Sequence, residues 1–450
     1  MDLFGTAGIR GSAQSRVTPD LALEVARAAG RNADAFVVGR DGRVTGDALA
    51  AAVSAGLTSA GADVTVVGQV PTPALAWASR GRHGVMLTAS HNPPEDNGIK
   101  LFDDGVEYGD AQEAAVEDAV AAGTEPARWN EWGERERDEI LADYRDAVAD
   151  YARGHGASLD GLTVAVDCGN GMASVATPQV LRDLGAHVVT LNANVDGHFP
   201  GRPSKPTPET IRDLRSFVAE GDADIGLAHD GDADRIVVVD SDGDVVHEDT
   251  VVAVLAEHYT RTSDVANPVV VTTPNASARV DERVTEAGGR VERVRLGALH
   301  EGIKAARSEG GDVVFAAEPW KHIHTRFGGW IDGVASAAVL SRLVADAGGL
   351  DALRAPVTER PYRKVSVECP DDLKAAVMDA LAEDLPTAFA DADVETEYGV
   401  RLAFPDGSWT LVRPSGTEPY VRVYAESDDV DALVADVTDV VRDAVEGERP

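Results

Sequence analysis

The sequence predicts an α/β protein that consists of three similar α/β domains with mixed sheets and a C-terminal α+β domain. The first observation behind this prediction is the length of 450 residues, which corresponds to roughly three domains of ordinary size, give or take one. The second is a strand–helix–strand unit that occurs three times, at intervals of roughly 100 residues. The third is the last part of the chain, which lacks this unit and alternates short strands with tight turns.

Each copy of the repeated unit has a strand rich in valine, a helix that ends near a glycine, and a second strand. The first strands of the three copies lie at residues 35–38, 162–166 and 268–271. β-Branched residues favour strands, and a glycine just after a helix can adopt the left-handed conformation that ends it. A strand, a helix and a strand joined by short links predict a sheet with parallel strand pairs, covered by helices.

The remaining segments complete the domain assignment. Residues 134–151 carry apolar side chains at helical spacing among charges, which predicts an amphipathic helix that connects the first two domains. Beyond residue 362, strands flank the turn Pro405-Asp-Gly407, as in an antiparallel sheet. The predicted domains are residues 1–153, 154–256, 257–356 and 357–450.

The composition excludes several classes of partner. Lysine and arginine total 41 against 77 aspartates and glutamates, so the formal net charge is −36. Nucleic acids and anionic membrane surfaces bind clustered cations, and we expect neither as a partner. The chain has no long apolar run, no leader of the secretory type and only two cysteines, which lie far apart. We therefore expect a soluble, cytoplasmic protein in a reducing compartment.

The basic residues are almost all arginine, with six lysines against 35 arginines. An acidic surface with few lysines is typical of a protein from a salt-rich cytoplasm, where screening reduces the repulsion among like charges. We therefore expect a halophilic archaeon as the source.

The first chemical motif is Thr88-Ala-Ser-His-Asn-Pro93, which follows an apolar strand and precedes Asn97-Gly-Ile-Lys100. A hydroxyl, an imidazole and an amine fall in a loop that proline and glycine keep out of helical structure, and reactive groups are often presented this way. Ser90 would be a nucleophile or phosphate carrier, with His91 and Lys100 handling protons or stabilising phosphate. The alternative is an ordinary Asn-Pro turn at the end of a strand.

The second motif is an acidic loop that follows another apolar strand. Asp230, Asp232 and Asp234 alternate along it, and closely spaced carboxylates suit a hard cation such as Mg²⁺. An acidic chain also forms such patterns by chance, and residues 240–244 repeat the spacing. That second set lies between two valine runs and is interpreted as a hairpin turn. The first set is followed by Arg235, which suits a phosphate site.

A third motif lies between two C-terminal strands. The backbone N–H groups and hydroxyls of Ser415, Gly416 and Thr417, with Arg413 and Arg422 on either side, would form a cradle for phosphate. The alternative is a plain Gly/Pro turn.

The loops that bind nucleotides are absent from the sequence, because neither Gly-x-x-x-x-Gly-Lys-Ser/Thr nor Gly-x-Gly-x-x-Gly after a strand occurs. A nucleotide-dependent kinase or dehydrogenase is therefore not expected. Residues 4–11 are glycine-rich and contain Arg10, which alone is a weak signal. A serine, an acidic triad and a separate phosphate cradle predict an enzyme that carries a phosphoryl group on Ser90 and exchanges it with a phosphorylated substrate.

Five segments together resemble the α-D-phosphohexomutase family, whose members move phosphate between the 1 and 6 positions of hexoses. They are FGTAGIRG, TASHNP, DGDADR, AEP and RPSGTEP, in the order that the family has. The resemblance implies four domains around one central cleft, the first three of them related. It also implies a phosphoserine enzyme that interconverts hexose 6-phosphate and hexose 1-phosphate, with Mg²⁺ as cofactor and a hexose 1,6-bisphosphate as activator and intermediate.

The resemblance also assigns roles to residues. It makes Ser90 the phosphoserine, which holds Mg²⁺ together with Asp230, Asp232 and Asp234. It surrounds the reacting centre with Arg10, His91, Lys100 and Arg235, of which Lys100 accepts the proton of the sugar hydroxyl. It places the non-reacting phosphate on Arg413, Ser415, Gly416, Thr417 and Arg422.

The segment that would read the sugar departs from the family. Members often have Gly-Glu-x-Ser-Gly-His, whereas this chain has Ala317-Glu-Pro-Trp-Lys-His322. Glu318 keeps the carboxylate that would bind the sugar hydroxyls, and His322 keeps the imidazole. Trp320 and Lys321 replace small residues, and Lys321 is counted among the substrate-binding residues.

Within the resemblance, FGTAGIRG together with TASHNP favours glucosamine 6-phosphate and glucosamine 1-phosphate as the substrate pair, with phosphomannomutase or phosphoglucomutase activity as the alternative. Two remoter alternatives stay open. An aspartyl phosphatase would use Asp230 as its nucleophile, and an inactive paralogue would bind sugar phosphates without turnover. The expected partners are small-molecule sugar phosphates, and the chain would be a monomer or a homodimer.

Overall fold

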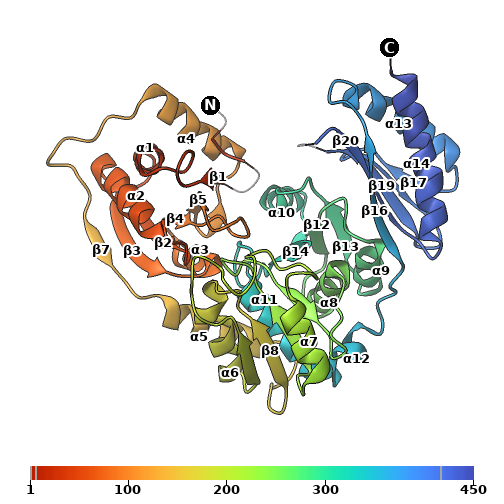
Figure 1. The fold of residues 1–450 in the computed structure, drawn as a ribbon, viewed down its shortest axis with the longest axis horizontal. Coiled ribbons are helices and arrows are strands. Elements are labelled where there is room, and N and C mark those ends of the chain that lie inside the picture. The colour runs from red at the N-terminus through yellow and green to blue at the C-terminus, as the bar shows by residue number, and fades with distance from the viewer. Residues whose placement is uncertain (1–2, 6–7, 416–417, 450) are drawn as a thin grey trace. The chain divides into compact units, whose positions relative to one another are not determined.

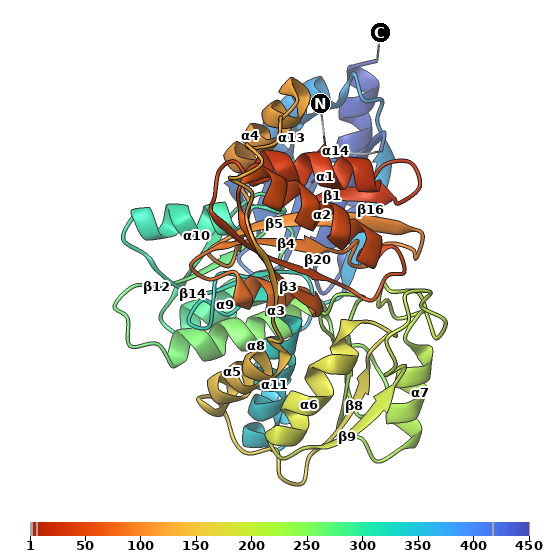
Figure 2. The same cartoon turned by 90° about the vertical axis from the view of Figure 1, so that its left-hand side faces the viewer.

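The structure of the chain is a computed structural model that describes residues 3–5, 8–415 and 418–449. Its contacts define two compact units, the first made of residues 1–251 and 319–354 and the second of residues 252–318 and 355–450. Figures 1 and 2 show the ribbon from two directions. The expected fold class is confirmed, because strand–helix–strand connections build the first sheets and the last sheet is antiparallel.

The first sheet lies in the first unit, together with four helices. Its strands are β1 (Ile9–Ser12), β2 (Ala35–Arg40), β3 (Asp63–Gln69), β4 (His83–Leu87), β5 (Asp96–Asp103), β6 (Val106–Glu107) and β7 (Arg135–Arg137), and the helices are α1 (Pro19–Ala29), α2 (Gly46–Ala60), α3 (Thr72–Ala78) and α4 (Asp110–Ala122). The order is β1-β5-β4-β2-β3-β7, with β6 on β5. β2 pairs in parallel with β3 and β4, and β5 is antiparallel to β1 and β4. Helices α1 and α2 pack side by side (Figure 2), and α2 covers β2 and β3.

The second sheet also lies in the first unit. It is formed by β8 (Thr163–Asp167), β9 (His187–Leu191), β10 (Ile225–Ala228) and β11 (Val237–Val239), in the order β11-β10-β8-β9. β8 is parallel to β9 and β10, whereas β11 is antiparallel to β10. The helical elements are η1 (Met172–Val175), α5 (Leu141–Arg153), α6 (Thr177–Asp183), α7 (Arg212–Glu220), α11 (Gly333–Ala347) and α12 (Leu350–Arg354). Helix α11 is buried along most of its length and packs against α5 and α6.

The connecting helix is shorter than the sequence predicted. Residues Arg135–Arg137 form β7, which pairs in parallel with β3. The backbone of Glu134 already bonds to that strand, because Val64 donates its N–H to the Glu134 carbonyl at 2.8 Å. Helical spacing therefore starts to apply only at Leu141, where the side chains of Tyr144 and Val148 become buried.

The three repeated helices end as the sequence predicted. Gly61, Gly185 and Gly288 follow α2, α6 and the third-repeat helix α9 (Ala278–Glu286), and their φ angles are +107°, +105° and +88°. A side chain at such a φ would be strained, so glycine fits these ends.

The second unit contains two further sheets. β12 (Pro268–Thr272) pairs in parallel with β13 (Arg290–Arg293) and β14 (Asp312–Glu318), beside α9 and α10 (Leu299–Ser308). The C-terminal sheet has the order β16-β20-β19-β18-β17, and all its pairs are antiparallel. Its elements are β16 (Tyr362–Glu368), α13 (Lys374–Ala388), β17 (Asp393–Glu395), β18 (Val400–Ala403), β19 (Trp409–Pro414), β20 (Tyr420–Glu426) and α14 (Val430–Gly447). Two elements adjoin the unit boundary, α8 (Glu248–Arg261) and β15 (Lys321–Ile323).

A buried ion pair lies within the second unit. Nη2 of Arg279, in α9, donates to Oε1 of Glu426, in β20, at 2.7 Å, and the Trp409 indole donates to the other carboxylate oxygen at 2.9 Å. Both charged side chains are at most 1% exposed. None of the helices in the described part of the chain is long and apolar enough to span a bilayer.

Candidate active site

The candidate active site lies in the first unit, at the carboxyl ends of parallel strands. Residues 88–93 follow β4, and residues 229–235 follow β10. Functional loops of open α/β sheets gather at these strand ends. The two loops meet, because the Ser90 hydroxyl donates a hydrogen bond to Oδ2 of Asp230 at 2.7 Å, although the residues are 140 positions apart.

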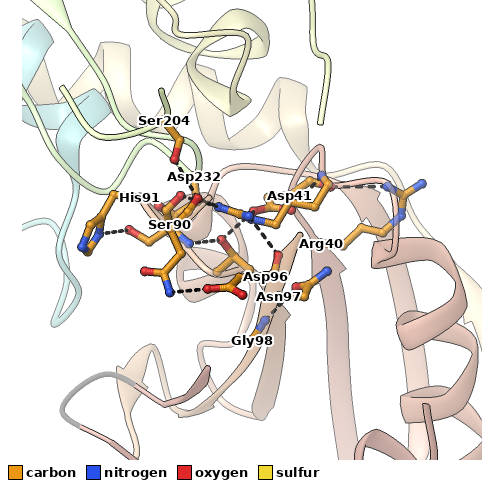
Figure 3. A network of polar contacts seen from close by, with 12 residues as sticks. Arg40, Asp41, Ser90, His91, Asp96, Asn97, Gly98, Ser204 and Asp232 are labelled. Carbon is orange, nitrogen blue, oxygen red and sulfur yellow. Dashed lines mark hydrogen bonds and ion pairs between the residues drawn. The ribbon is translucent and has the colours of Figure 1, made fainter. Parts of the chain in front are cut away.

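Ser90 is buried and has an unusual backbone conformation. Its φ of +51° lies in the left-handed region, which costs a residue other than glycine about 1 kcal/mol or more and is seen mainly at functional sites. Its N–H donates to Oγ1 of Thr88 at 2.9 Å, and Nδ1 of His91 lies 3.3 Å from its Oγ (Figure 3). The hydroxyl is therefore held in one place, between an imidazole and a carboxylate.

The three aspartates of the acidic loop are buried and converge. Asp230, Asp232 and Asp234 each offer one oxygen within 4.8 Å of the others. Burial and the two neighbouring carboxylates raise the pKa of Asp230 well above its usual value. Oδ1 of Asp232 and Oδ1 of Asp234 are buried and accept no hydrogen bond from the residues that the structure describes. An all-oxygen set with mutual repulsion and free acceptors fits Mg²⁺, so these aspartates, with the adjacent Ser90 Oγ, would hold it.

Lys100 lies beside the triad on β5. Its Nζ is 3.2 Å from Oδ2 of Asp234 and 3.2 Å from Oε1 of Glu107. Burial favours the neutral amine, but the charges of Glu107, Asp234 and Asp232 outweigh it and raise the pKa of Lys100 above its usual value. Lys100 is therefore an ammonium in this state of the protein, and its predicted role as proton acceptor stays a prediction.

Burial and the neighbouring cationic groups keep His91 neutral. Burial, with the nearby charges of Arg235 and Arg10, lowers the pKa of His91 to about 3. Nε of Arg235 lies 3.6 Å from Asp230 and 3.7 Å from Asp234. Nε of Arg10 is buried and has no hydrogen-bond partner in the described part of the chain. Burial opposes ionisation of Asp234, yet Lys100 and Arg235 lower its pKa below the usual value. The surroundings of Ser90 are thus rich in positive charge, as a phosphoryl group requires.

Sequence reasoning missed several residues of this site. Thr72, at the start of α3, donates its hydroxyl to Oδ2 of Asp232 at 2.6 Å, and Glu107 contacts Lys100 as described. Asp41 lies next to the Ser90 loop (Figure 3), and Arg43 donates to the carbonyl of Ser90. The sequence could have indicated these two residues. Asp41 directly follows strand β2 of the first repeat, just as the acidic loop follows β10.

The residues of the predicted sugar-reading segment lie in different surroundings. Glu318 ends β14 in the second unit and accepts the N–H of Gly297 at 2.5 Å. Lys321 forms a backbone bridge with Arg235, and its charge helps to lower the pKa of Asp234. His322 is 1% exposed, with Nδ1 3.0 Å from the hydroxyl of Ser336 in α11, and burial lowers its pKa to about 3. These contacts place His322 within the packing of α11.

The C-terminal phosphate motif connects β19 and β20 in the second unit; Gly416 and Thr417 lie outside the described residues. Arg413 and Arg422 are opposite each other in the register of the two strands, where like charges repel. Arg422 is paired with Glu418, and Nη2 of Arg413 donates to the Tyr424 hydroxyl at 2.9 Å. Among the described residues, Nε of Arg413 and Oγ of Ser415 are buried without a hydrogen-bond partner. Lys374 donates to the carbonyls of Ser415 and Glu418 at 2.6 Å each.

The fold and the first-unit site define the class of protein. The buried Ser90 has a strained backbone, and its hydroxyl lies against a group of carboxylates suited to a cation. Arginine and lysine side chains and a neutral imidazole lie nearby. Stabilisation of transferring charge by a cation and fixed positive groups is how proteins catalyse phosphoryl transfer. The chain is therefore equipped as a phosphoryl-transfer enzyme.

Comparisons with known proteins identify the family. Models of α/β/α domains I and II of the phosphoglucomutase/phosphomannomutase family match residues 1–127 and 142–243, and its C-terminal domain matches residues 365–444. A phosphopentomutase from Thermococcus kodakarensis is 43% identical over 95% of this chain and 94% of its own. A probable phosphoglucosamine mutase from Methanopyrus kandleri is 42% identical over 98% of both chains.

A solved structure agrees with these sequence relatives. A phosphoglucomutase/phosphomannomutase family protein from Burkholderia thailandensis superposes with a TM-score of 0.85 at 28% identity, over 100% of this chain and 98% of that one. This chain belongs to the phosphoglucomutase/phosphomannomutase family. It is accordingly a mutase, an isomerase that acts by phosphoryl transfer.

Proposed function

We propose that this mutase interconverts glucosamine 6-phosphate and glucosamine 1-phosphate through a phosphoserine at Ser90 and a bisphosphorylated sugar. The observation that carries the proposal is the 2.7 Å contact between the Ser90 hydroxyl and Asp230, which supports a phosphate carrier next to the proposed cation site. Archaeal relatives named as probable phosphoglucosamine mutases, at 34–42% identity, support the sugar.

The reaction consists of two transfers. In the first, the bond between phosphorus and Oγ of Ser90 breaks, a bond forms between phosphorus and the free hydroxyl of the sugar monophosphate, and the hydroxyl proton passes to a base. The proposed base is Lys100 in its neutral form, which a cation on the aspartates would favour by offsetting the charges that raise its pKa. In the second, the other phosphate of the bisphosphate moves to Ser90, and the proton returns. Mg²⁺ bound at the three aspartates would neutralise charge on the transferring phosphoryl group.

The remaining site residues bind and orient. Arg10, His91 and Arg235 surround the transferring group, while the non-reacting phosphate binds Arg413, Ser415, Gly416, Thr417 and Arg422. Glu318 accepts hydrogen bonds from the sugar hydroxyls, and Lys321 and His322 are the other residues of this segment that bind the substrate. The unpartnered Nε of Arg413 and Oγ of Ser415 support the assignment of the phosphate. The domain boundaries after residues 153, 256 and 356 belong to the same proposal.

The identity of the sugar is the part of the proposal for which a specific alternative exists. The Thermococcus relative named as a phosphopentomutase is as similar to this chain as the phosphoglucosamine mutases are, so a pentose phosphate is a second candidate. Mannose and glucose phosphates are the alternatives within hexoses.

We predict that glucosamine 1-phosphate has the highest kcat/KM among the 1-phosphates of glucosamine, glucose, mannose and ribose. Each would be assayed with Mg²⁺ and the matching bisphosphate as primer, and the expected preference is at least about tenfold, since a site that hydrogen-bonds one substituent disfavours a sugar lacking it. Replacement of Glu318 by glutamine should reduce this preference. Equal rates on all hexoses, or a higher rate on the ribose compound, would overturn the assignment.

We further propose that the acidic surface adapts the enzyme to a salt-rich cytoplasm, as in a halophilic archaeon, and that it acts as a monomer or homodimer. The chain has a net charge of −36, and salt weakens the repulsion among its carboxylates by screening them. The midpoint of thermal unfolding should therefore be more than about 10 °C higher in 2 M KCl than in 0.1 M KCl. The same measurement in NaCl is the control, and an equal rise there would exclude an effect specific to potassium. A midpoint that falls or stays constant would contradict this adaptation, and sedimentation in the same buffers gives the oligomeric state.

A further inference from the structure

Beneath the Ser90 loop lies a buried guanidinium for which the proposed reaction has no role. The side chain of Arg43 is fully buried, and its group lies over the ring of Phe199, 5.1 Å from the centroid. It donates to four backbone carbonyls of residues 90–96. Nη2 donates to Ser90 at 3.0 Å and to Asn92 at 2.7 Å, and Nη1 donates to Pro93 at 2.5 Å and to Asp96 at 2.9 Å.

The loop needs such a donor because of its shape. At φ +51°, Ser90 turns the chain so that these carbonyls converge on one point beneath it. A planar guanidinium presents five N–H groups in a fixed fork, whereas the ammonium of lysine is a compact group with three donors. Arginine at position 43 is therefore the side chain that can satisfy all four carbonyls and hold the turn.

Asp41 completes the support from the other side of Ser90. Its carboxylate accepts from Nε of Arg43 at 3.1 Å and from the hydroxyl of Thr88 at 2.7 Å. The same Thr88 oxygen accepts the N–H of Ser90 at 2.9 Å. Arg43 thus holds the carbonyl of Ser90, and Asp41 holds its N–H through Thr88, so one ion pair fixes both peptide groups of the strained residue.

The acidic loop packs closely against the backbone of Ser90 and limits how far the Ser90 loop can move. A Cβ at Gly231 would lie 2.6 Å from the Ser90 carbonyl oxygen, so the two loops are in close backbone contact there. If the Ser90 loop relaxed, it would move against the loop that carries the aspartates. The distance between Oγ of Ser90 and Asp230 therefore depends on the support beneath Ser90.

We propose that Arg43 and Asp41 are positioning residues that keep Oγ of Ser90 in line for phosphoryl transfer. The inference rests on the proposed function, because it concerns the transfer to and from Ser90. It assigns neither residue to contact with the sugar. Their loss should lower the rate of each transfer and leave sugar binding unchanged.

The test compares Arg43→Lys with the wild type and with Arg279→Lys, whose arginine is equally buried in an ion pair but lies in the second unit. Each protein is phosphorylated with ³²P-labelled glucosamine 1,6-bisphosphate, the labelled fraction is counted, and transfer to glucosamine 1-phosphate is followed by rapid quench. Per labelled site, Arg43→Lys should transfer about 10- to 100-fold more slowly, with KM within twofold, since small displacements of a reacting group have effects of this size. Arg279→Lys should lower only the midpoint of unfolding.

Thr88→Val serves as a second variant if Arg43→Lys does not fold, because it removes the link to the Ser90 N–H with little change in volume. It should lower the transfer rate in the same direction, by a smaller factor. Unchanged transfer per labelled site in whichever of these variants folds, or an equal loss in Arg279→Lys, would overturn the inference. A wild type that takes up no label would instead contradict the proposed function, and the inference would fall with it.

Discussion

Replacement of Ser90 by alanine is expected to abolish mutase turnover, with a loss of at least about 10³-fold in kcat. The hydroxyl is the proposed carrier of the phosphoryl group, and no other hydroxyl in the described part of the chain is shown bonded to the side chain of Asp230. The measurement is a coupled assay with glucosamine 1-phosphate, combined with intact-mass detection of the phosphorylated protein. The mass increase of one phosphate should be present in the wild type and absent from the variant.

Ser204→Ala is the matched control for this experiment. Its hydroxyl donates to the Asn92 carbonyl of the same loop at 2.9 Å, but it does not touch the reacting group. Its activity should fall by no more than a few-fold, with the phosphate still on the protein. Activity that survives in Ser90→Ala would refute the phosphoserine and favour the aspartyl phosphatase, in which Asp230 is the nucleophile. A wild type that neither takes up phosphate nor turns over substrate would favour the inactive paralogue.

Replacement of Asp232 by asparagine is expected to remove most of the activity and to weaken Mg²⁺ binding, with an effect of about 10²-fold or more on kcat/KM. Asparagine has the same shape but no charge, and Oδ1 of Asp232 is a buried acceptor to which none of the described residues donates. The variant therefore loses charge where a cation would bind and keeps the packing. Magnesium titrations of activity and calorimetric titration of the protein with Mg²⁺ alone measure the two effects.

The second acidic set supplies the control for Asp232→Asn. Asp240 caps its own turn, because Oδ1 accepts the N–H groups of Asp242 at 3.2 Å and Asp244 at 2.9 Å, and Arg354 neutralises it. This confirms the hairpin turn that the sequence predicted. Asp242→Asn should therefore leave the Mg²⁺ dependence unchanged. An Asp232→Asn enzyme with the wild-type dependence on Mg²⁺ would show that the triad is not the cation site.

Much of the chemistry could be read from residue types in loops. Ser90 and Asp230 each follow an apolar strand, and a polar group at that position of an α/β unit is placed where functional loops gather. The strands and the glycine-ended helices were predictable for a similar reason, since β-branched runs and left-handed glycines act through local backbone energies. These features depend on a few neighbouring residues and need no knowledge of the rest of the chain.

Other features could not be predicted because distant segments create them. Residues 135–137 appeared helical but pair with β3, since a strand edge satisfies their backbone groups better than an isolated helical turn does. The burial of the His322 imidazole beside Ser336 of α11 could not be read from the sequence, and its role in binding the sugar stays a prediction. Glu107 gave no signal in sequence, yet it is one of the charges that keep Lys100 protonated.

The sequence alone determined the α/β class, the three repeats, the acidic surface and the residue types available for phosphoryl transfer. Only the tertiary structure decided that Ser90 and Asp230 share a hydrogen bond, that burial and mutual repulsion leave the aspartates suited to a cation, and that Arg43 holds the Ser90 turn. The reason is physical: propensity and periodicity are properties of local sequence, whereas desolvation, charge coupling and hydrogen-bond geometry arise when segments 47 and 140 positions apart are brought together.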